Sequence, residues 1–420
     1  MGSMKRYVAA TLLVAVLGAQ SAHAQAPSEG KPPYSIWTTP TLLRFPGSPF
    51  DALRTKGIDI GGSVTSFYQS LTSGSGDHSW RHGAKGDLKV LLDSTRMGLW
   101  QGTIVSFHQE WNWGRDDNKS GAGVLLPVNT AMAFPSLGGD NQNTSLNVTQ
   151  NFGDMFSVSF GKFNMLDLAS RTPILGGGGL DTFMNMALAA PISGVTPPYL
   201  FGGMASIKTP YVIFTGMLYD PRNAQDPEVI RRPFTVGRTY SLSATVPAKL
   251  FDLPGFYGVR GAYSDKKALD LDSIPQLALP PGARFLRQKQ GYTYFSFSMQ
   301  QFLYVVPGSP GQGFGVFAEY GVSEGNPNPI KWHLIAGLSG TGVFDRELDR
   351  WGVGYFKYVL SQDLKDSLAE LGEGRRDEWG VEAYYNLAVT PWLRVTGNVQ
   401  WIRPTDPCLL YTSPSPRDRG

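Results

Sequence analysis

Histidine and carboxylate side chains are the groups of this sequence best suited to acid–base or metal chemistry. His108, Glu110 and Ser106 are spaced two positions apart and therefore share one face of an extended strand. Hydrolases use these residue types as nucleophile and base. Polar side chains facing a water-filled interior explain the spacing without catalysis, and we favour that interpretation. His78 and His82 lie in a glycine-rich turn, where we expect solvated histidines rather than a metal pair.

Two loop motifs resemble ligand-binding signatures but lack an essential residue. Asp116–Gly121 begins like a calcium loop, yet its twelfth position is Pro127 instead of the bidentate Glu. We expect this segment to be a solvated loop. Gly176–Gly179 lacks the Gly-Lys-Ser/Thr that completes a phosphate loop. We therefore predict no catalytic residue, no metal site and no cofactor, and we do not expect an enzyme.

The first residues have the three parts of an export signal. Lys5 and Arg6 precede the apolar run Val8–Gly18, and Ala22-His23-Ala24 supplies a small-x-small cleavage site. A run of 11 residues is shorter than the ~20 that a membrane-spanning helix requires. Residues 1–24 are therefore predicted to be a signal peptide.

The last residues have a different origin. The stretch from Cys408 to Asp418 can be back-translated into a sequencing-adapter sequence, so residues 408–420 are predicted to be a non-native tail. We expect that the natural gene was cut near Pro407. Residues 25–407 then contain no cysteine, which excludes disulfides, thiolate metal sites and a cysteine nucleophile from that part.

The charge of residues 25–407 is balanced. Once the signal peptide and the tail are set aside, the 37 basic and 34 acidic residues of the chain become 33 of each. A nucleic-acid partner requires an excess of positive charge. We therefore expect no nucleic-acid binding.

The elements that must position any polar site are short strands. From Ile58 onward, apolar and small polar residues alternate with a period of two, which is typical of strands with two different faces. About fourteen such segments occur, many of them long enough to cross a bilayer at a tilt. The clearest are Phe156–Phe160, Tyr240–Val246, Phe314–Tyr320, Trp332–Leu338, Trp379–Leu387 and Leu393–Trp401.

The connections between these strands differ in length, and tryptophans lie near the strand ends. Short turns alternate with long Gly-, Pro- or Asn-rich connections, as in bacterial outer-membrane barrels. Tryptophans near strand ends fit an interfacial girdle. The sequence predicts an all-β fold, a transmembrane antiparallel β-barrel over residues 58–407, preceded by a periplasmic segment at residues 25–57. The long connections are 114–142, 164–203 and 268–290, and the tryptophans are Trp351, Trp379, Trp392 and Trp401.

Several ordered fragments resemble the carbohydrate-selective porins, the OprB-type sugar channels of Gram-negative outer membranes. The likeness covers nearly all of the mature chain. It is found at Leu53–Ile58, Ser66–Tyr68, Ser73–Gly76, Leu92–Gly102, Phe183–Asn185, Gly202–Pro210 and Tyr384–Ile402.

The resemblance implies a barrel of about 16 strands. Its last strand would be missing here, because the non-native tail replaces it. Passive diffusion of small hydrophilic solutes, chiefly mono- and oligosaccharides, is the implied function, in contact with outer-membrane lipid. Whether the protein is a monomer or a homotrimer stays open.

Ten side chains are candidates for lining or narrowing the pore. Some are placed by strand alternation, and others lie in the segment Asn164–Gly203, which would constrict the pore if it folds inward or would be an ordinary outer loop otherwise. They are His108, Glu110, Asp167, Arg171, Asp181, Glu319, Lys331, His333, Glu382 and Arg394. Two alternative functions remain: an outer-membrane lipid-modifying enzyme, and a secreted β-rich sugar-binding protein.

Overall fold

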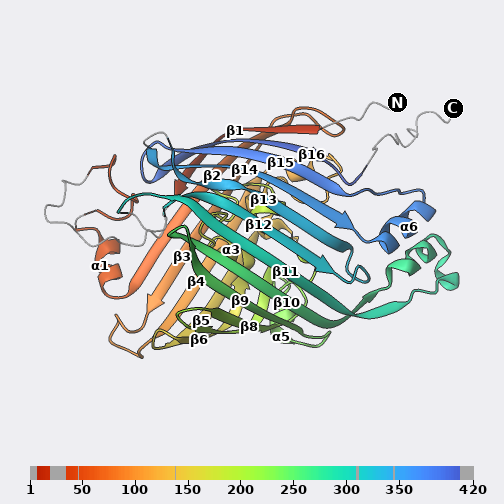
Figure 1. Ribbon diagram of the computed structural model, residues 1–420, viewed down its shortest axis with the longest axis horizontal. Coiled ribbons are helices and arrows are strands. Elements are labelled where there is room, and N and C mark those ends of the chain that lie inside the picture. The colour runs from red at the N-terminus through yellow and green to blue at the C-terminus, as the bar shows by residue number, and fades with distance from the viewer. Residues whose placement is uncertain are drawn as a thin grey trace.

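Figure 1 shows a computed structural model of the chain, in which antiparallel strands run obliquely around a common axis. The structure describes residues 35–406 except Pro46, Gly138, 309–311 and 344–345, together with strand β1, Tyr7–Gly18. The predicted tail, residues 408–420, and both ends of the predicted signal peptide lie outside the described residues.

Fifteen strands follow β1 in the described part of the chain, and each pairs with its neighbour in sequence. The alternating segments predicted above all fall within them. They are β2 (Ile58–Leu71), β3 (Arg81–Asp93), β4 (Thr103–Gly114), β5 (Gln142–Phe152), β6 (Phe156–Asn164), β7 (Tyr199–Lys208), β8 (Ile213–Tyr219), β9 (Thr239–Leu250), β10 (Leu253–Leu269), β11 (Gln288–Val305), β12 (Gly313–Ser323), β13 (Ile330–Val343), β14 (Arg346–Leu360), β15 (Glu378–Ala388) and β16 (Leu393–Arg403).

The two ends of this sheet are not paired directly. Within the described residues, β2 and β16 form no ladder with each other, and β1 lies between them and pairs with both. The fifteen strands β2–β16 therefore do not close into a cylinder by themselves. The predicted all-β, antiparallel barrel sheet is confirmed; the signal-peptide assignment of residues 1–24 stays a prediction.

Most of the strands β2–β16 alternate between an apolar outer face and a more polar inner face. In β9, Tyr240 and Leu242 are 46% and 64% exposed on the outside, whereas Ser241 and Ser243 point inward. In β15, the inward-facing Glu382 is fully buried. The alternation that the sequence shows is therefore the difference between the outside and the inside of the barrel.

Outward-facing aromatic side chains gather near both ends of the strands. Trp379 and Trp401 make an edge-to-face contact with ring centroids 5.6 Å apart, where β15 begins and β16 ends. Trp351 packs against Phe314 with centroids 5.6 Å apart at the opposite end of the barrel. Trp392 lies in a turn and donates its Nε1 hydrogen to Ile36 O at 2.6 Å.

The connections divide by length between the two ends of the barrel. Short turns such as 153–155, 209–212 and 251–252 lie at the end where helix α1 (Pro49–Thr55) is found, which we call the short-turn end. Long connections such as 361–377, with helix α6 (Gln362–Glu370), lie at the opposite, long-loop end (Figure 1). The long-loop end also carries α5 (Pro227–Arg231), η2 (Leu271–Ala278) and η3 (Pro281–Ala283).

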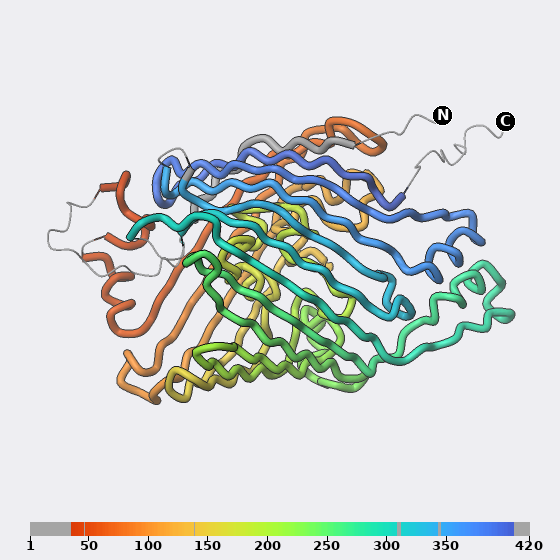
Figure 2. The backbone as a smooth tube through the Cα atoms, viewed as in Figure 1, coloured from red at the N-terminus to blue at the C-terminus, as the bar shows by residue number. Residues whose placement is uncertain are grey.

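Two long connections fold into the barrel instead of standing above it. We call residues 115–141 inner loop A and residues 165–198 inner loop B. The backbone trace in Figure 2 shows both passing behind the front wall of strands. The loops are bonded to each other, with Thr130 N donating to Met184 O at 2.8 Å and Met186 N donating to Pro127 O at 2.9 Å.

Short helices in both loops begin at asparagine or aspartate caps. In each case the side-chain oxygen accepts a backbone N–H two or three residues later, which satisfies a donor that the first turn leaves free. The helices are η1 (Asp117–Lys119, capped by Asp116), α2 (Thr130–Ser136, capped by Asn129), α3 (Met165–Ala169, capped by Asn164) and α4 (Met186–Ala189, capped by Asn185).

The apolar core of the molecule lies inside the barrel, between inner loop B and the wall. Phe183 is fully buried and packs edge-to-face on Phe317 and Tyr384, with centroids 5.5 and 4.9 Å away. Leu188 approaches Gly354, where an added Cβ would lie 2.8 Å from the leucine. The wall strands carry glycine here because the loop packs directly on their backbone.

The expectation of a solvated loop at Asp116–Gly121 is wrong. Asp117 is 4% exposed and pairs with Arg81 of β3 at 2.8 Å. Burial raises the pKa of the Asp117 carboxyl, although the arginine opposes this shift. The segment is buried because inner loop A enters the barrel, which its local sequence does not reveal. No helix in the described part of the chain is long and apolar enough to span a membrane.

Candidate functional site

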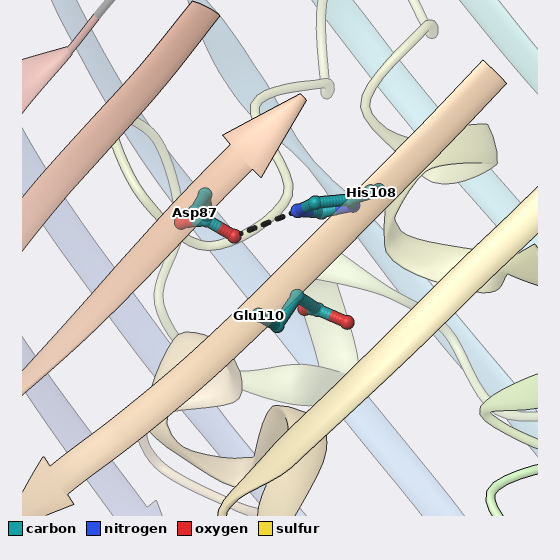
Figure 3. A group of neighbouring side chains, drawn as sticks. All are labelled: Asp87, His108 and Glu110. Atoms are coloured by element: carbon teal, nitrogen blue, oxygen red, sulfur yellow. Dashed lines mark hydrogen bonds and ion pairs between the residues drawn. The ribbon is translucent and has the colours of Figure 1, made fainter. Parts of the chain in front are cut away.

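A cluster of charged side chains lies on the inner faces of β3 and β4. Figure 3 shows Asp87 from β3 beside His108 and Glu110 from β4. The His108 Nε2 atom lies 2.9 Å from Asp87 Oδ1, and the Lys85 ammonium donates to Glu110 Oε1 at 2.6 Å. Alternation brings these groups together, since residues two apart on a strand point the same way.

The cluster is bonded to inner loop B through His108. Its Nδ1 atom lies 2.7 Å from Asp167 Oδ2, and Lys89 donates to the other oxygen of Asp167 at 2.7 Å. Two carboxylate acceptors require both ring nitrogens to donate, which makes His108 an imidazolium. Burial raises the pKa of Asp167, but hydrogen bonding to His108 and the charge of Lys89 outweigh burial and hold it well below its usual range.

Glu110 connects the same cluster to both inner loops. It accepts from the Tyr199 hydroxyl at 2.9 Å, just where inner loop B returns to the wall. Its partner Lys85 also donates to Phe134 O of inner loop A at 2.8 Å, and Asn112 donates to the same carbonyl at 3.0 Å. A fully buried carboxylate is stable here because charged and hydroxyl donors surround it.

Two buried carboxylates on β15 hold the loops against a second part of the wall. Glu382 accepts from the backbone N–H groups of Met184 and Asn185 at 2.5 and 3.0 Å, both in inner loop B. Glu378 accepts from Leu126 N of inner loop A at 3.2 Å and from Leu125 N. Glu382 and Glu378 are four residues apart on one strand face, and each holds a different loop.

The ten predicted residues fall into separate groups. His108, Glu110 and Asp167 are brought together beside β4, and Glu382 lies apart from them on β15. Asp181 pairs with Arg350 at 3.1 Å. This pair and Arg394 lie beside one cavity, described below.

The remaining predicted residues lie elsewhere. Glu319 faces His333 at 3.4 Å, and the His333 ring stacks on Tyr358 with centroids 4.9 Å apart. Lys331 sits at a β-bulge where β13 begins, is exposed, and donates to a backbone carbonyl. Arg171 follows α3 and is also exposed.

Several contributing residues were not predicted from the sequence. Lys85, Asp87 and Lys89 occupy alternate positions of β3, so their inward face could have been recognised as a row of charges. Glu378 and Arg350 carried no such signal, because their importance depends on loops that are distant in sequence.

One group of side chains has the spacing of a metal site. One ligand atom from each of Asp87, His108 and Glu110 lies within 4.8 Å of the others. The ammonium of Lys85 lies 2.6 Å from Glu110 Oε1 and 3.7 Å from Asp87 Oδ1, in the place where a cation would bind. Both His108 nitrogens are also engaged, so the donor set fits a buried ion network better than a metal.

One motif matches the nucleophile elbow of hydrolases, Gly321-Val-Ser-Glu-Gly325. Ser323 ends β12, and its hydroxyl donates to Ile330 O. The motif therefore continues a strand towards a hairpin connection, without the strand-to-helix turn that exposes a nucleophile in those enzymes.

Inner loops A and B narrow the interior of the barrel, and hydrogen bonds and ion pairs hold them to its wall. Where the loops press on the wall, inward-facing side chains are buried. On the inner faces of β5–β9 they keep partial exposure and are mostly small and polar: Asn147, Thr149, Ser157, Ser206, Thr215, Ser243 and Thr245. Such a surface can pass a hydrated solute and hydrogen-bond to it.

Comparison with known proteins gives a family match. The model of the family described as "Carbohydrate-selective porin, OprB family" matches residues 141–406, more than half of the chain. No curated protein sequence matches the chain.

Solved structures give a match in fold. The high-pH structure of Pseudomonas putida OprB superposes with a TM-score of 0.70 at 19% identity, covering 85% of this chain and 96% of that one. A mutant of Rh. blastica porin gives a TM-score of 0.38 at 9% identity, covering 82% of this chain and 100% of that one. Pseudomonas aeruginosa OccK11 gives 0.36 at 9% identity, covering 95% and 94%. The last two are too distant to contribute to the argument.

Proposed function

Because the chain belongs to the carbohydrate-selective porin family, and is an outer-membrane porin for carbohydrates in a Gram-negative bacterium, we propose a specific route for the solute. The route runs between inner loop B and the partly exposed inner faces of β5–β9. Mono- and oligosaccharides diffuse along it passively, and no chemical step is assigned to any residue.

One observation carries this proposal: both inner loops are bonded to the wall at two separate places, on β3–β4 and on β15. Inner loop B is bonded to His108 of β4 at one place and to Glu382 of β15 at the other. A loop bonded to the wall at Asp167 and at Met184 keeps its place beside the passage. Such a passage discriminates solutes by size and by hydrogen bonding.

Charged side chains lie beside the proposed route. Lys89 and Asp167 are 56% and 28% exposed at their side chains, and Arg260 projects inward from β10, where it donates to Thr196 of inner loop B at 2.6 Å. We propose that these groups hydrogen-bond to sugar hydroxyls during passage. The ordinary orientation of such barrels puts the short-turn end in the periplasm and the long-loop end outside.

We also propose that the outer surface contacts lipid and that the protein has no enzymatic role. The outer faces carry exposed apolar side chains in a continuous band, including Phe160, Leu242 and Phe297. Acyl chains would cover such a band. A secreted sugar-binding protein would expose it to water.

Liposome swelling tests the proposal. Proteoliposomes are diluted into iso-osmotic glucose, maltose, an amino acid or a larger oligosaccharide, and the fall in turbidity is recorded. We expect glucose to enter fastest, maltose more slowly, and the larger oligosaccharide hardly at all. The amino acid should be slower than glucose.

The other outcomes discriminate between functions. Equal rates for all small solutes would leave a porin without sugar preference. An absence of swelling from a folded, heat-modifiable barrel would contradict the channel and return attention to a membrane enzyme, which fatty-acid release from phospholipid would detect.

A further inference from the structure

A small cavity lies on the far side of inner loop B from the charged cluster of β3 and β4. Its volume is about 150 Å³. The loop segment from Ser170 to Thr182 covers one side, and Ser339, Tyr384 and Arg394 of the wall form the other. Its remaining lining includes Gln312, Thr341 and Glu347, which adjoin turns of the short-turn end.

Two buried polar atoms beside this cavity have no hydrogen-bond partner among the described residues. They are Thr182 Oγ1 and Arg394 Nε, in residues that are 3% and 6% exposed. Arg394 uses its Nη1 atom to donate to Leu348 O at 3.0 Å and to Asn386 Oδ1 at 2.6 Å. An unpaired buried polar atom is unfavourable, so two such atoms at one cavity indicate a binding partner there.

Three of the hydroxyls that line the cavity donate their hydrogens to backbone carbonyls. Ser170 donates to Asp167 O at 3.0 Å, Thr172 donates to Ala169 O at 2.9 Å, and Thr341 donates to Gly313 O at 3.4 Å. Each of these oxygens can still accept. A ligand that binds to these three oxygens must donate hydrogens to them, which a carboxylate or phosphate group does not do.

The arginines at the cavity require a ligand that accepts hydrogen bonds. Arg350 is 29% exposed at its side chain and is held by Asp181 at 3.1 Å, and Arg394 lies beside the same cavity. Guanidinium groups only donate, so the ligand must also accept. A neutral molecule with several hydroxyls satisfies both sets of groups, and the cavity has room for one sugar ring rather than a chain.

We propose that this cavity is a monosaccharide-binding site on the short-turn side of inner loop B. The inference rests on the proposed function, and it adds a second, weak binding step after the passage beside β5–β9. A channel conducts best when each site releases its solute readily. The site would retain a sugar close to the periplasmic mouth before release.

Equilibrium dialysis of detergent-solubilised full-length protein with radiolabelled glucose tests the site. Thr182→Val removes the unpaired hydroxyl at constant shape, and Arg350→Gln removes a guanidinium donor. We expect glucose affinity to fall about threefold in the first variant and about tenfold in the second, since each loses a hydrogen bond to the ligand. Thr55→Val and Arg231→Gln, on α1 and α5 outside the barrel, are matched controls and should bind like the parent.

Three outcomes would overturn the inference: no saturable glucose binding by the parent, unchanged affinity in both variants, or tighter binding of gluconate than of glucose. Gluconate, which carries a negative charge, tests whether the cavity binds an anion instead. Liposome swelling distinguishes the absence of this binding site from the absence of a channel. Normal glucose swelling of the parent without these binding effects removes only the site, whereas absent swelling of a folded parent removes the proposed function itself.

Discussion

Glu382 shows how a single residue fixes the shape of the passage. Its carboxylate is fully buried and accepts two backbone N–H groups of inner loop B and the amide of Asn398. A carboxylate can accept several hydrogens at once. An amide of the same shape offers one accepting oxygen and turns two donors toward groups that also donate.

Glu382→Gln should therefore loosen inner loop B. We expect a loss of about 1–3 kcal/mol for the donor left unpaired, and an increased single-channel conductance in planar bilayers. Urea unfolding checks the stability and the conductance checks the passage. Glu370→Gln, at an exposed position of α6, should change neither; parental conductance in the Glu382 variant would contradict the anchoring role.

Asp220 plays a similar part in a long external connection. It is fully buried and accepts from the Arg222 side chain at 2.7 and 3.0 Å and from Phe234 N at 2.6 Å. Burial raises its pKa, but these hydrogen bonds outweigh burial and hold the pKa of Asp220 below its ordinary value. The carboxylate therefore binds protons less readily in the folded chain than in the unfolded chain.

This shift predicts the response of that connection to acid. A lowered folded-state pKa gives a stabilisation that is complete above the unfolded value, near 3.8, and is lost as the pH falls below it. Hydrogen exchange should show a protected Phe234 amide at neutral pH that loses protection in acid. Asp220→Asn should lack this protection even at pH 7. Equal protection of both proteins at pH 7 would refute the assignment.

At the scale of elements, strand β9 separates lipid from water by alternation alone. Leu242 is 64% exposed on the outer face, and its neighbour Ser243 points into the barrel. A charge on the lipid side of such a strand is unfavourable by about 2–4 kcal/mol at the midplane and by less near the interfaces. The same charge inside remains hydrated.

The variants Leu242→Arg and Ser243→Arg should therefore affect different properties, the first stability and the second transport. We expect the first to lower stability against urea in lipid vesicles. The second should leave stability close to the parent and reduce the rate of sugar-driven swelling, because a long side chain enters the passage. If both variants lost the same stability, the assignment of the two faces would be wrong.

At the scale of the whole molecule, the sheet depends on the pairing at its two ends. Among the described residues, β2 and β16 are connected in the sheet through Tyr7–Gly18, which pairs with both. An open sheet edge leaves backbone groups unpaired, and such groups are unfavourable by several kcal/mol each in lipid. Exposed edges also promote association between molecules.

Residues 25–420 refolded in detergent should therefore be less compact than residues 1–420. We expect the shorter chain to lose the heat-modifiable gel shift at a lower temperature and to aggregate more, as light scattering would record. The longer chain, refolded in parallel, is the control. Identical melting of the two chains would show that the pairing of Tyr7–Gly18 does not stabilise the sheet.

The sequence by itself determined the class of fold and the direction of its side chains. Alternation with a period of two is a local property, so segments such as Trp379–Leu387 could be assigned to strands without knowledge of their neighbours. The same alternation placed Glu382 on the polar face. Ordered fragments such as Tyr384–Ile402 supplied the family resemblance, which the match over residues 141–406 confirmed.

Only the tertiary structure decided what fills the barrel and what each polar group holds. The segment Asp116–Gly121 of inner loop A was expected to be a solvated loop, and its burial depends on contacts such as Arg81 with Asp117, which are 36 residues apart. The pairing of Glu382 with Met184 spans 198 residues. Backbone N–H groups have no sequence signature as partners, since every residue except proline carries one. The strands could therefore be predicted from local pattern, whereas the passage and its anchors could not.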